Sequence, residues 1–200
     1  MTEPVVHVID DDEAVRSSLA FFLEMADLPP RTYASAVEFL KVASSLTGGC
    51  IVTDVRMPEM SGLELVRRLK DIGVGLPVIV ITGHGDVPLA VEAMRAGVVD
   101  FIEKPFEHDV LLASVRDALS RGADRTERPE RQRFEEMLST LSGREREVLK
   151  GVVDGKLNKV IAYELGISPR TVEVYRANVM SKTGASSLSE LVRIALLAGF

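Results

Sequence analysis

The stretch "CIVTDVRMPEMSG" (Cys50–Gly62) decides the fold class of this 200-residue chain. Its first four residues form an apolar, β-rich run of the kind found in a strand covered on both faces, and the run ends on the carboxylate of Asp54. Pro58 and Gly62 then shape a turn into a helical pattern with an apolar stripe at Leu63–Ile72. A strand that ends on a charged residue just before a turn and a helix is typical of a parallel sheet that binds ligands at its strand ends.

Strand and helix signals alternate in the same way along the first 120 residues. The predicted strands are Val5–Ile9, Arg31–Ala34, Cys50–Asp54, Pro77–Gly83 and Val98–Ile102. Apolar residues at helical spacing follow each strand, as Val15, Leu19, Phe22 and Leu23 follow the first. Repeated βα units predict an α/β fold, a flavodoxin-like (βα)5 domain with a five-stranded parallel sheet between two helical layers.

The charge distribution divides the chain into two modules. Residues 1–121 carry a net charge of −8, and residues 137–200 carry +3 in an all-helical pattern punctuated by glycines. Between them, residues 122–136 are almost free of apolar side chains and alternate in charge, so we predict a linker that is partly helical. An acidic front and a basic rear indicate modules with different partners, the rear one being a candidate for a polyanion.

Composition excludes several classes of protein. The single cysteine, Cys50, rules out an internal disulfide and suits the reducing cytosol. No apolar run is long enough to predict a transmembrane helix, and the first ten residues lack the basic stretch of a signal peptide. We therefore expect a cytoplasmic protein that does not enter a membrane.

Chemically reactive residues end four of the predicted strands. Asp10 and Asp11 end the first, Asp54 the third, Thr82 the fourth and Lys104 the fifth. Carboxylates that converge at one sheet edge repel one another unless a cation intervenes, and two carboxylates, a carbonyl and waters suit Mg²⁺. With the metal bound, Asp54 is a nucleophile for phosphoryl transfer, while Thr82 and Lys104 would contact the phosphoryl oxygens.

The alternative is that these acids only cap helices, as Asp12 could do ahead of Glu13-Ala14-Val15. That role is common for any single strand-end aspartate. It does not explain why two acidic strand ends are accompanied by a threonine and a lysine in this order.

The segments "VIDDDEAVR", "DVRMPEMSG", "VIVITGHGD" and "DFIEKPF" resemble the receiver domains of bacterial response regulators over about residues 4–120. The resemblance makes Asp54 the phosphoacceptor, which would receive its phosphoryl group from a sensor histidine kinase. It implies that Asp10, Asp11, Asp54 and the backbone carbonyl of Arg56 hold the divalent metal.

The resemblance also implies a switch. Phe101 aligns with an aromatic side chain that turns inward when the Thr82 hydroxyl moves toward the phosphate, although it could also be a plain core residue. Lys104-Pro105 aligns with a bond that is cis in the family. Phosphorylation would promote formation of a homodimer.

The competing class is a phosphatase with an aspartyl-phosphate intermediate. Such enzymes place a second acid two residues after the nucleophile, and Arg56 occupies that position here. We therefore expect no enzyme, but at most self-phosphotransfer and autodephosphorylation at Asp54.

The rear module contains "NKVIAYELGISPRTVEVYRANVM", which predicts two short helices joined by a tight turn, with Ser168 as N-cap and Pro169 at the first helical position. Val172, Tyr175 and Val179 would face the core, as in a helix-turn-helix whose second helix enters the major groove of double-stranded DNA. The predicted DNA contacts are Lys159, Arg170, Thr171, Glu173, Val174, Arg176, Ala177 and Lys182.

The predicted contacts divide into two kinds. Lys159, Thr171 and Lys182 suit phosphates, whereas the carboxylate of Glu173 is repelled by phosphates and suits a cytosine amino group. Periodicity alone leaves open a helical bundle with solvated charges, or an output that binds a protein.

The segments "LSGREREVL", "NKVIAYELGISPRTVEVYRANVMSKTG" and "SELVRIAL" resemble the LuxR-type four-helix DNA-binding domain over about residues 138–200. Tyr175 departs from the histidine common at this position, and the final helix, Ser187–Ala198, often dimerises in the family. A receiver, a charged linker and a LuxR-type domain together are similar to response regulators of the FixJ type. This similarity implies a transcriptional activator, because the FixJ branch is named for an activator of nitrogen-fixation genes.

Overall fold

The structure is a computed structural model that describes residues 5–83, 87–121 and 127–200. The chain forms two compact units. The first is made by residues 1–84 and 96–125, and the second by residues 85–95 and 126–200.

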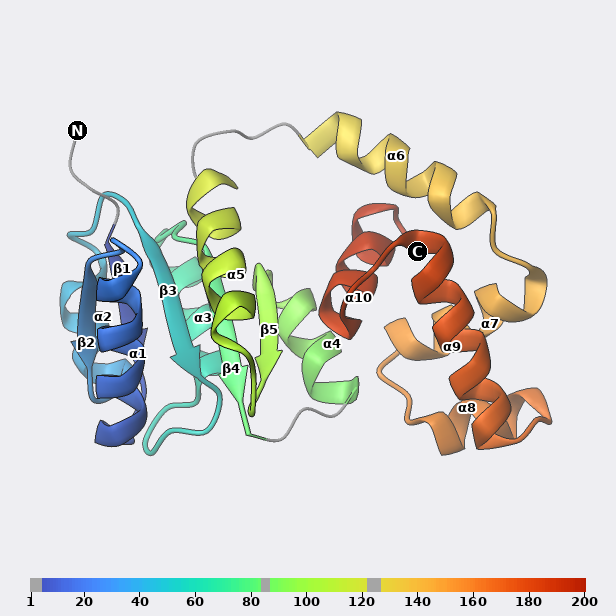
Figure 1. Ribbon diagram of the computed structural model, residues 1–200, viewed down its shortest axis with the longest axis horizontal. Helices are drawn as coiled ribbons and strands as arrows, with labels where there is room; N and C mark the ends of the chain where they lie inside the picture. The colour runs from blue at the N-terminus through green and yellow to red at the C-terminus, as the bar shows by residue number, and fades with distance from the viewer. Residues whose placement is uncertain (1–4, 84–86, 122–126) are drawn as a thin grey trace. The chain divides into compact units, whose positions relative to one another are not determined.

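Strands and helices alternate in the first part of the chain, and helices alone follow (Figure 1). The strands are β1 (Val6–Ile9), β2 (Pro30–Tyr33), β3 (Cys50–Asp54), β4 (Val78–Thr82) and β5 (Asp100–Glu103). The helices among and after them are α1 (Glu13–Met25), α2 (Ala36–Ala43), α3 (Gly62–Asp71), α4 (Val87–Arg95) and α5 (His108–Arg121). The remaining helices are α6 (Glu127–Ser139), α7 (Gly143–Val153), α8 (Asn158–Leu165), α9 (Pro169–Thr183) and α10 (Leu188–Leu197).

All five strands form one parallel sheet in the order β2-β1-β3-β4-β5. The predicted five-stranded parallel sheet is thereby confirmed. The strand order reverses direction between β1 and β3, so a crevice opens at the carboxyl ends of these two strands. Asp10 directly follows β1 and Asp54 is the last residue of β3, which places both carboxylates at this crevice.

Helices cover both faces of the sheet (Figure 1). Helices α1 and α5 pack on one face, and α2 and α3 lie on the other. The first face is held by a buried cluster of Val6, Val8, Leu19, Leu23, Cys50, Val52, Ile79, Ile81, Ile102, Leu111, Val115 and Ala118. Burial on both faces explains why β3 and β4 are apolar almost throughout rather than alternating.

The other face contains an aromatic cluster around His7. The ring of His7 lies 5.5 Å from that of Phe39 and 5.9 Å from that of Tyr33, and its Nδ1 is 3.2 Å from the Tyr33 hydroxyl. Nε2 of His7 is buried without a hydrogen-bond partner. Burial, and secondarily the charge of Arg31, lower the pKa of His7 from 6.5 to about 4, so the ring is neutral in the folded protein.

The second unit contains the predicted helix-turn-helix in α8 and α9. Helix α8 is C-capped by Gly166, whose φ of 65° favours glycine. Helix α9 begins at Pro169, directly after its N-cap Ser168. The Ser168 hydroxyl accepts from the Thr171 amide at 3.1 Å. Val172 and Val179 are buried, and these caps and the core direction agree with the sequence prediction.

Helix α6 covers most of the segment predicted as a linker, while residues 122–126 lie outside the described residues. Residues 85–95, with α4, group with the second unit. The predicted domain boundaries at 121 and 136 stay predictions. Throughout the described ranges, every helix is too short or too polar to cross a bilayer.

Candidate phosphoacceptor site and nucleic-acid interface

Lys104 connects the acidic strand ends of the first unit. Lys104 directly follows β5, and its Nζ lies 2.8 Å from Oδ1 of Asp54 at the end of β3 and 3.2 Å from Oδ2 of Asp10, which follows β1. The two carboxylates therefore flank one point at the crevice. Burial acts to lower the pKa of Lys104, but its hydrogen bond to Asp54 and the two negative charges together raise it, so the ammonium stays charged.

Both the backbone amide and the carboxylate of Asp10 make hydrogen bonds. Its backbone amide donates to the Tyr33 carbonyl at 3.3 Å, and its Oδ1 accepts from the Asp12 amide at 2.9 Å. Burial raises the pKa of Asp10, against the opposing effects of the Asp12 amide and Lys104. A carboxylate that burial destabilises gains most from a bound cation.

Asp54 is fixed by the turn that follows it. Its Oδ2 accepts from the Arg56 amide at 2.6 Å, and its carbonyl accepts from the Thr53 hydroxyl at 3.1 Å. The turn closes where the Gly62 amide donates to the Val55 carbonyl at 2.9 Å. A Cβ on Gly62 would collide with the Asp54 carbonyl, so only glycine allows α3 to begin this close to the acceptor.

Thr82 and Phe101 lie on the neighbouring strands β4 and β5. Thr82 is buried at the end of β4, and its carbonyl accepts from the Lys104 amide at 2.7 Å. Phe101 is 9% exposed. The Lys104-Pro105 peptide bond is cis, as the resemblance implied.

The residues at the crevice fit a hard divalent cation. In the described part of the chain, no group of three or more histidine, cysteine or acidic side chains could hold a metal by itself. The predicted side chains of Asp10, Asp11 and Asp54 do not form such a group, but Asp10 and Asp54 both contact Lys104, and two carboxylates with a backbone carbonyl and waters suit Mg²⁺. Asp11 is exposed, and its predicted role as a metal ligand stays a prediction.

Two residues next to the site have roles that the sequence analysis missed or left open. Asp12 caps α1, since its Oδ1 accepts from the amides of Ala14 at 2.8 Å and Val15 at 3.3 Å. Arg16 was not predicted, yet its Nη1 donates to the Asp10 carbonyl at 2.6 Å. The available signal was an arginine one turn into a helix that follows a strand-end aspartate.

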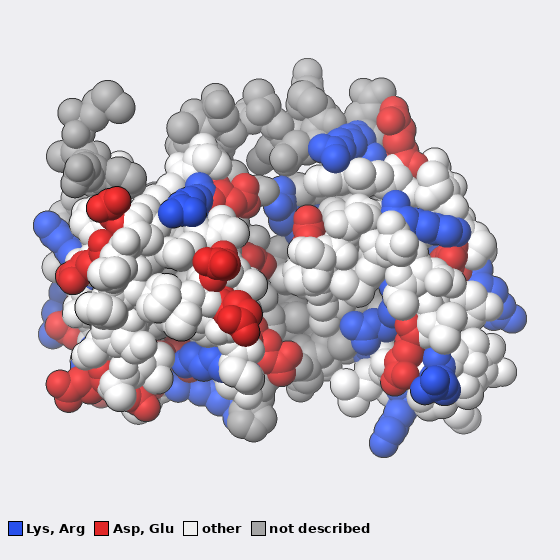
Figure 2. All heavy atoms as spheres, viewed as in Figure 1, with Lys and Arg blue, Asp and Glu red and all other residues white. Residues whose placement is uncertain are grey.

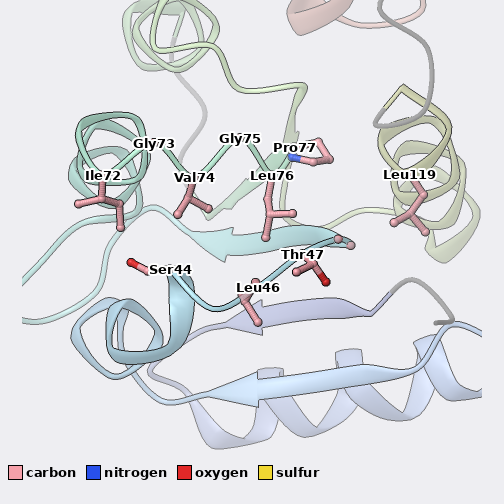
Figure 3. Close-up of a pocket in the computed structure, with 12 residues that line it drawn as sticks. Ser44, Leu46, Thr47, Ile72, Gly73, Val74, Gly75, Leu76, Pro77 and Leu119 are labelled. Atoms are coloured by element: carbon pink, nitrogen blue, oxygen red, sulfur yellow. The ribbon is translucent and has the colours of Figure 1, made fainter. Parts of the chain in front are cut away.

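A separate hollow lies at the opposite edge of the sheet (Figure 3). Loops after α2 and α3 and one residue of α5 line its volume of about 490 Å³. The residues around it are Ser44, Leu46, Thr47, Gly48, Gly49, Ile72, Gly73, Val74, Gly75, Leu76, Pro77 and Leu119. None of these is charged, so this hollow lacks the groups that phosphoryl transfer requires.

Most of the predicted DNA contacts are exposed in the second unit. Lys159, Arg170, Glu173, Val174, Ala177 and Lys182 are exposed, and Thr171 and Arg176 are half-buried. On the face shown in Figure 2, basic side chains make up much of this unit's charged surface, whereas acidic ones prevail over the first unit. This face agrees with the charge asymmetry expected from the sequence.

Two of these predicted contacts also have partners within the unit. Arg176 Nη1 donates to Asn158 Oδ1 at 2.9 Å, which fixes the second helix-turn-helix helix against the first. Lys182 Nζ lies 2.6 Å from Glu145 Oε2, and the capping box of α7 holds the same carboxylate. The hydrogen bond from Lys182, with the Ser142 amide, lowers the pKa of Glu145 to about 2.

Comparison with known proteins agrees with both units. Residues 6–116 match the response regulator receiver domain, which is more than half of the chain. The chain belongs to the response regulators. Residues 139–195 match the bacterial regulatory proteins of the luxR family. The two matches confirm the resemblances noted in the sequence.

Full-length relatives narrow the family to the FixJ type. The chain is 57% identical to the transcriptional regulatory protein FixJ of Azorhizobium caulinodans, over 97% of this chain and 92% of the relative. It is 53% identical to FixJ of Rhizobium meliloti, over 100% of this chain and 98% of the relative. Full-length FixJ from B. japonicum matches the structure with a TM-score of 0.60 at 48% identity, covering 100% of this chain and 98% of that one.

This response regulator of the FixJ type is therefore a phosphorylation-activated transcriptional regulator. Its receiver domain implies a kinase partner, and its LuxR-type domain implies DNA binding. A regulator of this kind is not a typical enzyme.

Proposed function

We propose that Asp54 accepts a phosphoryl group from a sensor histidine kinase, in a step that requires Mg²⁺. The observation that supports this most directly is the contact of Lys104 with both Asp54 and Asp10. An aspartate oxygen becomes a phosphoacceptor where fixed cations neutralise the charge on the transferring group. Asp10, Asp11, Asp54 and the Arg56 carbonyl would hold the metal, which supplies further neutralisation when bound.

In the reaction, an Asp54 oxygen forms a bond to phosphorus while the bond from phosphorus to the kinase histidine breaks, and the electron pair stays with the histidine nitrogen. Lys104 exchanges its contact with Asp54 for one with a phosphoryl oxygen. The Thr82 hydroxyl donates to another oxygen. Phe101 then follows Thr82, and the receiver shifts toward its active state as a change in population.

The proposed output is a homodimer that reads two half-sites of promoter DNA. Dimerisation would involve the receiver and α10, and α9 would enter the major groove. The similarity to FixJ suggests activation of nitrogen-fixation-type promoters, in the cytoplasm. With Arg56 where a phosphatase places its second acid, hydrolysis would be limited to slow autodephosphorylation of Asp54.

Incubation with acetyl phosphate and Mg²⁺, followed by intact mass measurement, tests the acceptor. The wild type should gain one phosphoryl group and Asp54→Asn none. Asp71→Asn, which removes an exposed carboxylate at the end of α3, is the matched control and should behave as wild type. Phosphorylation of Asp54→Asn to the wild-type extent would show that another residue is the acceptor.

A further inference from the structure

The carbonyl of Asp10 lies just beyond the end of the sheet. The last paired residue of β1 is Ile9, opposite Tyr33 of β2 and Thr53 of β3. The ladder therefore offers the Asp10 carbonyl no strand partner. The guanidinium of Arg16, which is half-buried in α1, reaches back six residues and donates to this oxygen at 2.6 Å.

This hydrogen bond fixes the residue that follows. The Asp10 carbonyl and the Asp11 amide belong to one planar peptide unit, so holding the oxygen also fixes the position of the Asp11 Cα. On the other side, Asp12 is anchored as the N-cap of α1, and its amide donates to Asp10 Oδ1. Asp11 is thus an exposed carboxylate on a backbone that is held at both neighbours.

We propose that Arg16 is a positioning residue for the metal site, because it holds the Asp10–Asp11 peptide in the orientation that lets both carboxylates face the cation. The proposal rests on the proposed function, since it assumes that Mg²⁺ binds at this edge. Groups that orient the ligands of a metal contribute to its affinity, and losing one lowers affinity by about 10-fold or more.

A role of Arg16 through its charge and a role through positioning predict opposite changes in Mg²⁺ affinity when the residue is replaced. A guanidinium beside a cation site repels the cation, so a residue that acted only by its charge would weaken Mg²⁺ binding, and its removal would tighten it. A residue that positions the ligands strengthens binding, and its removal weakens it. The sign of the change therefore separates the two roles.

The test is an NMR titration of the full chain with Mg²⁺ alone, which follows the amides of Asp11, Asp54 and Arg56. Arg16→Gln should bind Mg²⁺ about 10-fold more weakly than wild type. Arg16→Lys, which keeps the charge but not the planar fork, should fall between the two. Arg116→Gln, which removes an exposed arginine from α5, should bind as wild type.

A second readout separates binding from chemistry. With acetyl phosphate as donor, Arg16→Gln should need more Mg²⁺ for half-maximal phosphorylation of Asp54, while the rate at saturating Mg²⁺ stays close to wild type. A loss of folding would instead lower the phosphorylation rate at saturating Mg²⁺ as well.

The outcomes are distinct. Wild-type or tighter Mg²⁺ binding by Arg16→Gln would overturn the positioning role. If Arg16→Gln does not fold, as judged by circular dichroism, Arg16→Lys decides in the same way, with wild-type affinity contradicting the proposal. Absence of Mg²⁺ binding in the wild type itself would instead contradict the proposed function.

Discussion

Lys104 Nζ lies 2.8 Å from Asp54 Oδ1, and the two residues come from strand ends 50 positions apart in the sequence. This contact places a cation beside the proposed phosphoacceptor before any donor arrives. It also places that cation where a divalent metal would feel its repulsion. The residue therefore has two separable effects on the site.

Replacement of Lys104 by methionine separates these effects. Because a like charge is removed, Lys104→Met should bind Mg²⁺ at least about 10-fold more tightly than wild type. Because a donor to the transferring group is lost, phosphorylation at saturating Mg²⁺ should slow by about 100-fold. An Mg²⁺ titration and a time course with acetyl phosphate measure the two, with the exposed Lys41→Met as control. An unchanged phosphorylation rate would remove Lys104 from the mechanism.

Gly62→Ala should disturb the acceptor through the backbone. The added Cβ would collide with the Asp54 carbonyl, so the end of β3 or the start of α3 has to move. Crowding of this kind destabilises a protein by about 1–3 kcal/mol, and the shifted Asp54 should be phosphorylated more slowly. Gly75→Ala is the matched control, because its Cβ would meet open space. Urea unfolding and phosphorylation of the two variants should differ, and equal behaviour would contradict the close-approach argument.

His7 should make the first unit sensitive to acid. Its pKa is about 4 in the folded state and 6.5 when exposed, so the unfolded chain binds a proton more readily. Stability is therefore fully present above pH 6.5 and falls as the pH drops toward 4. The shift corresponds to about 3 kcal/mol.

His7→Phe keeps an aromatic ring beside Phe39 and Tyr33 but cannot take up a proton. Its unfolding free energy should therefore depend less on pH in this range, as measured by urea titrations. A His7→Phe curve parallel to that of wild type would show that other groups cause the acid sensitivity.

The exposed charges of the helix-turn-helix should act differently on DNA. Lys159→Ala should weaken binding to specific and random duplexes alike and lower the salt dependence by about one ion, as expected for a phosphate contact. Glu173→Ala should instead relax the preference at one base pair, at a cost of about 1–3 kcal/mol in discrimination. Binding measured against a panel of duplexes at several salt concentrations separates the two. Uniformly tighter binding by Glu173→Ala would mean that the carboxylate only repels DNA.

Much of the fold follows from the sequence because a parallel sheet covered on both faces leaves a strong signal. The apolar runs that form β3 and β4 were predicted almost residue for residue, since burial requires such runs. The last strand was predicted at 98–102 but is Asp100–Glu103. Val98 and Val99 pack in the core ahead of the strand, so their apolar character does not mark its start.

The sequence predicted which residues form the candidate site, but not the contacts that hold those residues in place. Strand-end positions alone bring Asp10, Asp54 and Lys104 together, because parallel strands end at one edge. No sequence pattern states that Arg16 reaches the Asp10 carbonyl, since the contact depends on the angle at which α1 leaves the strand. Likewise, only the packed core gives His7 a neutral, partnerless nitrogen.

The measurement that tests the central claim most directly compares DNA affinity before and after phosphorylation. The full chain is incubated with acetyl phosphate and Mg²⁺, and its binding to promoter duplex and its self-association are measured in parallel with Asp54→Asn. We expect phosphorylated wild type to self-associate and to bind DNA about 10-fold or more tightly, while Asp54→Asn changes in neither property. A phosphorylated wild type with unchanged self-association and unchanged DNA affinity would contradict the account.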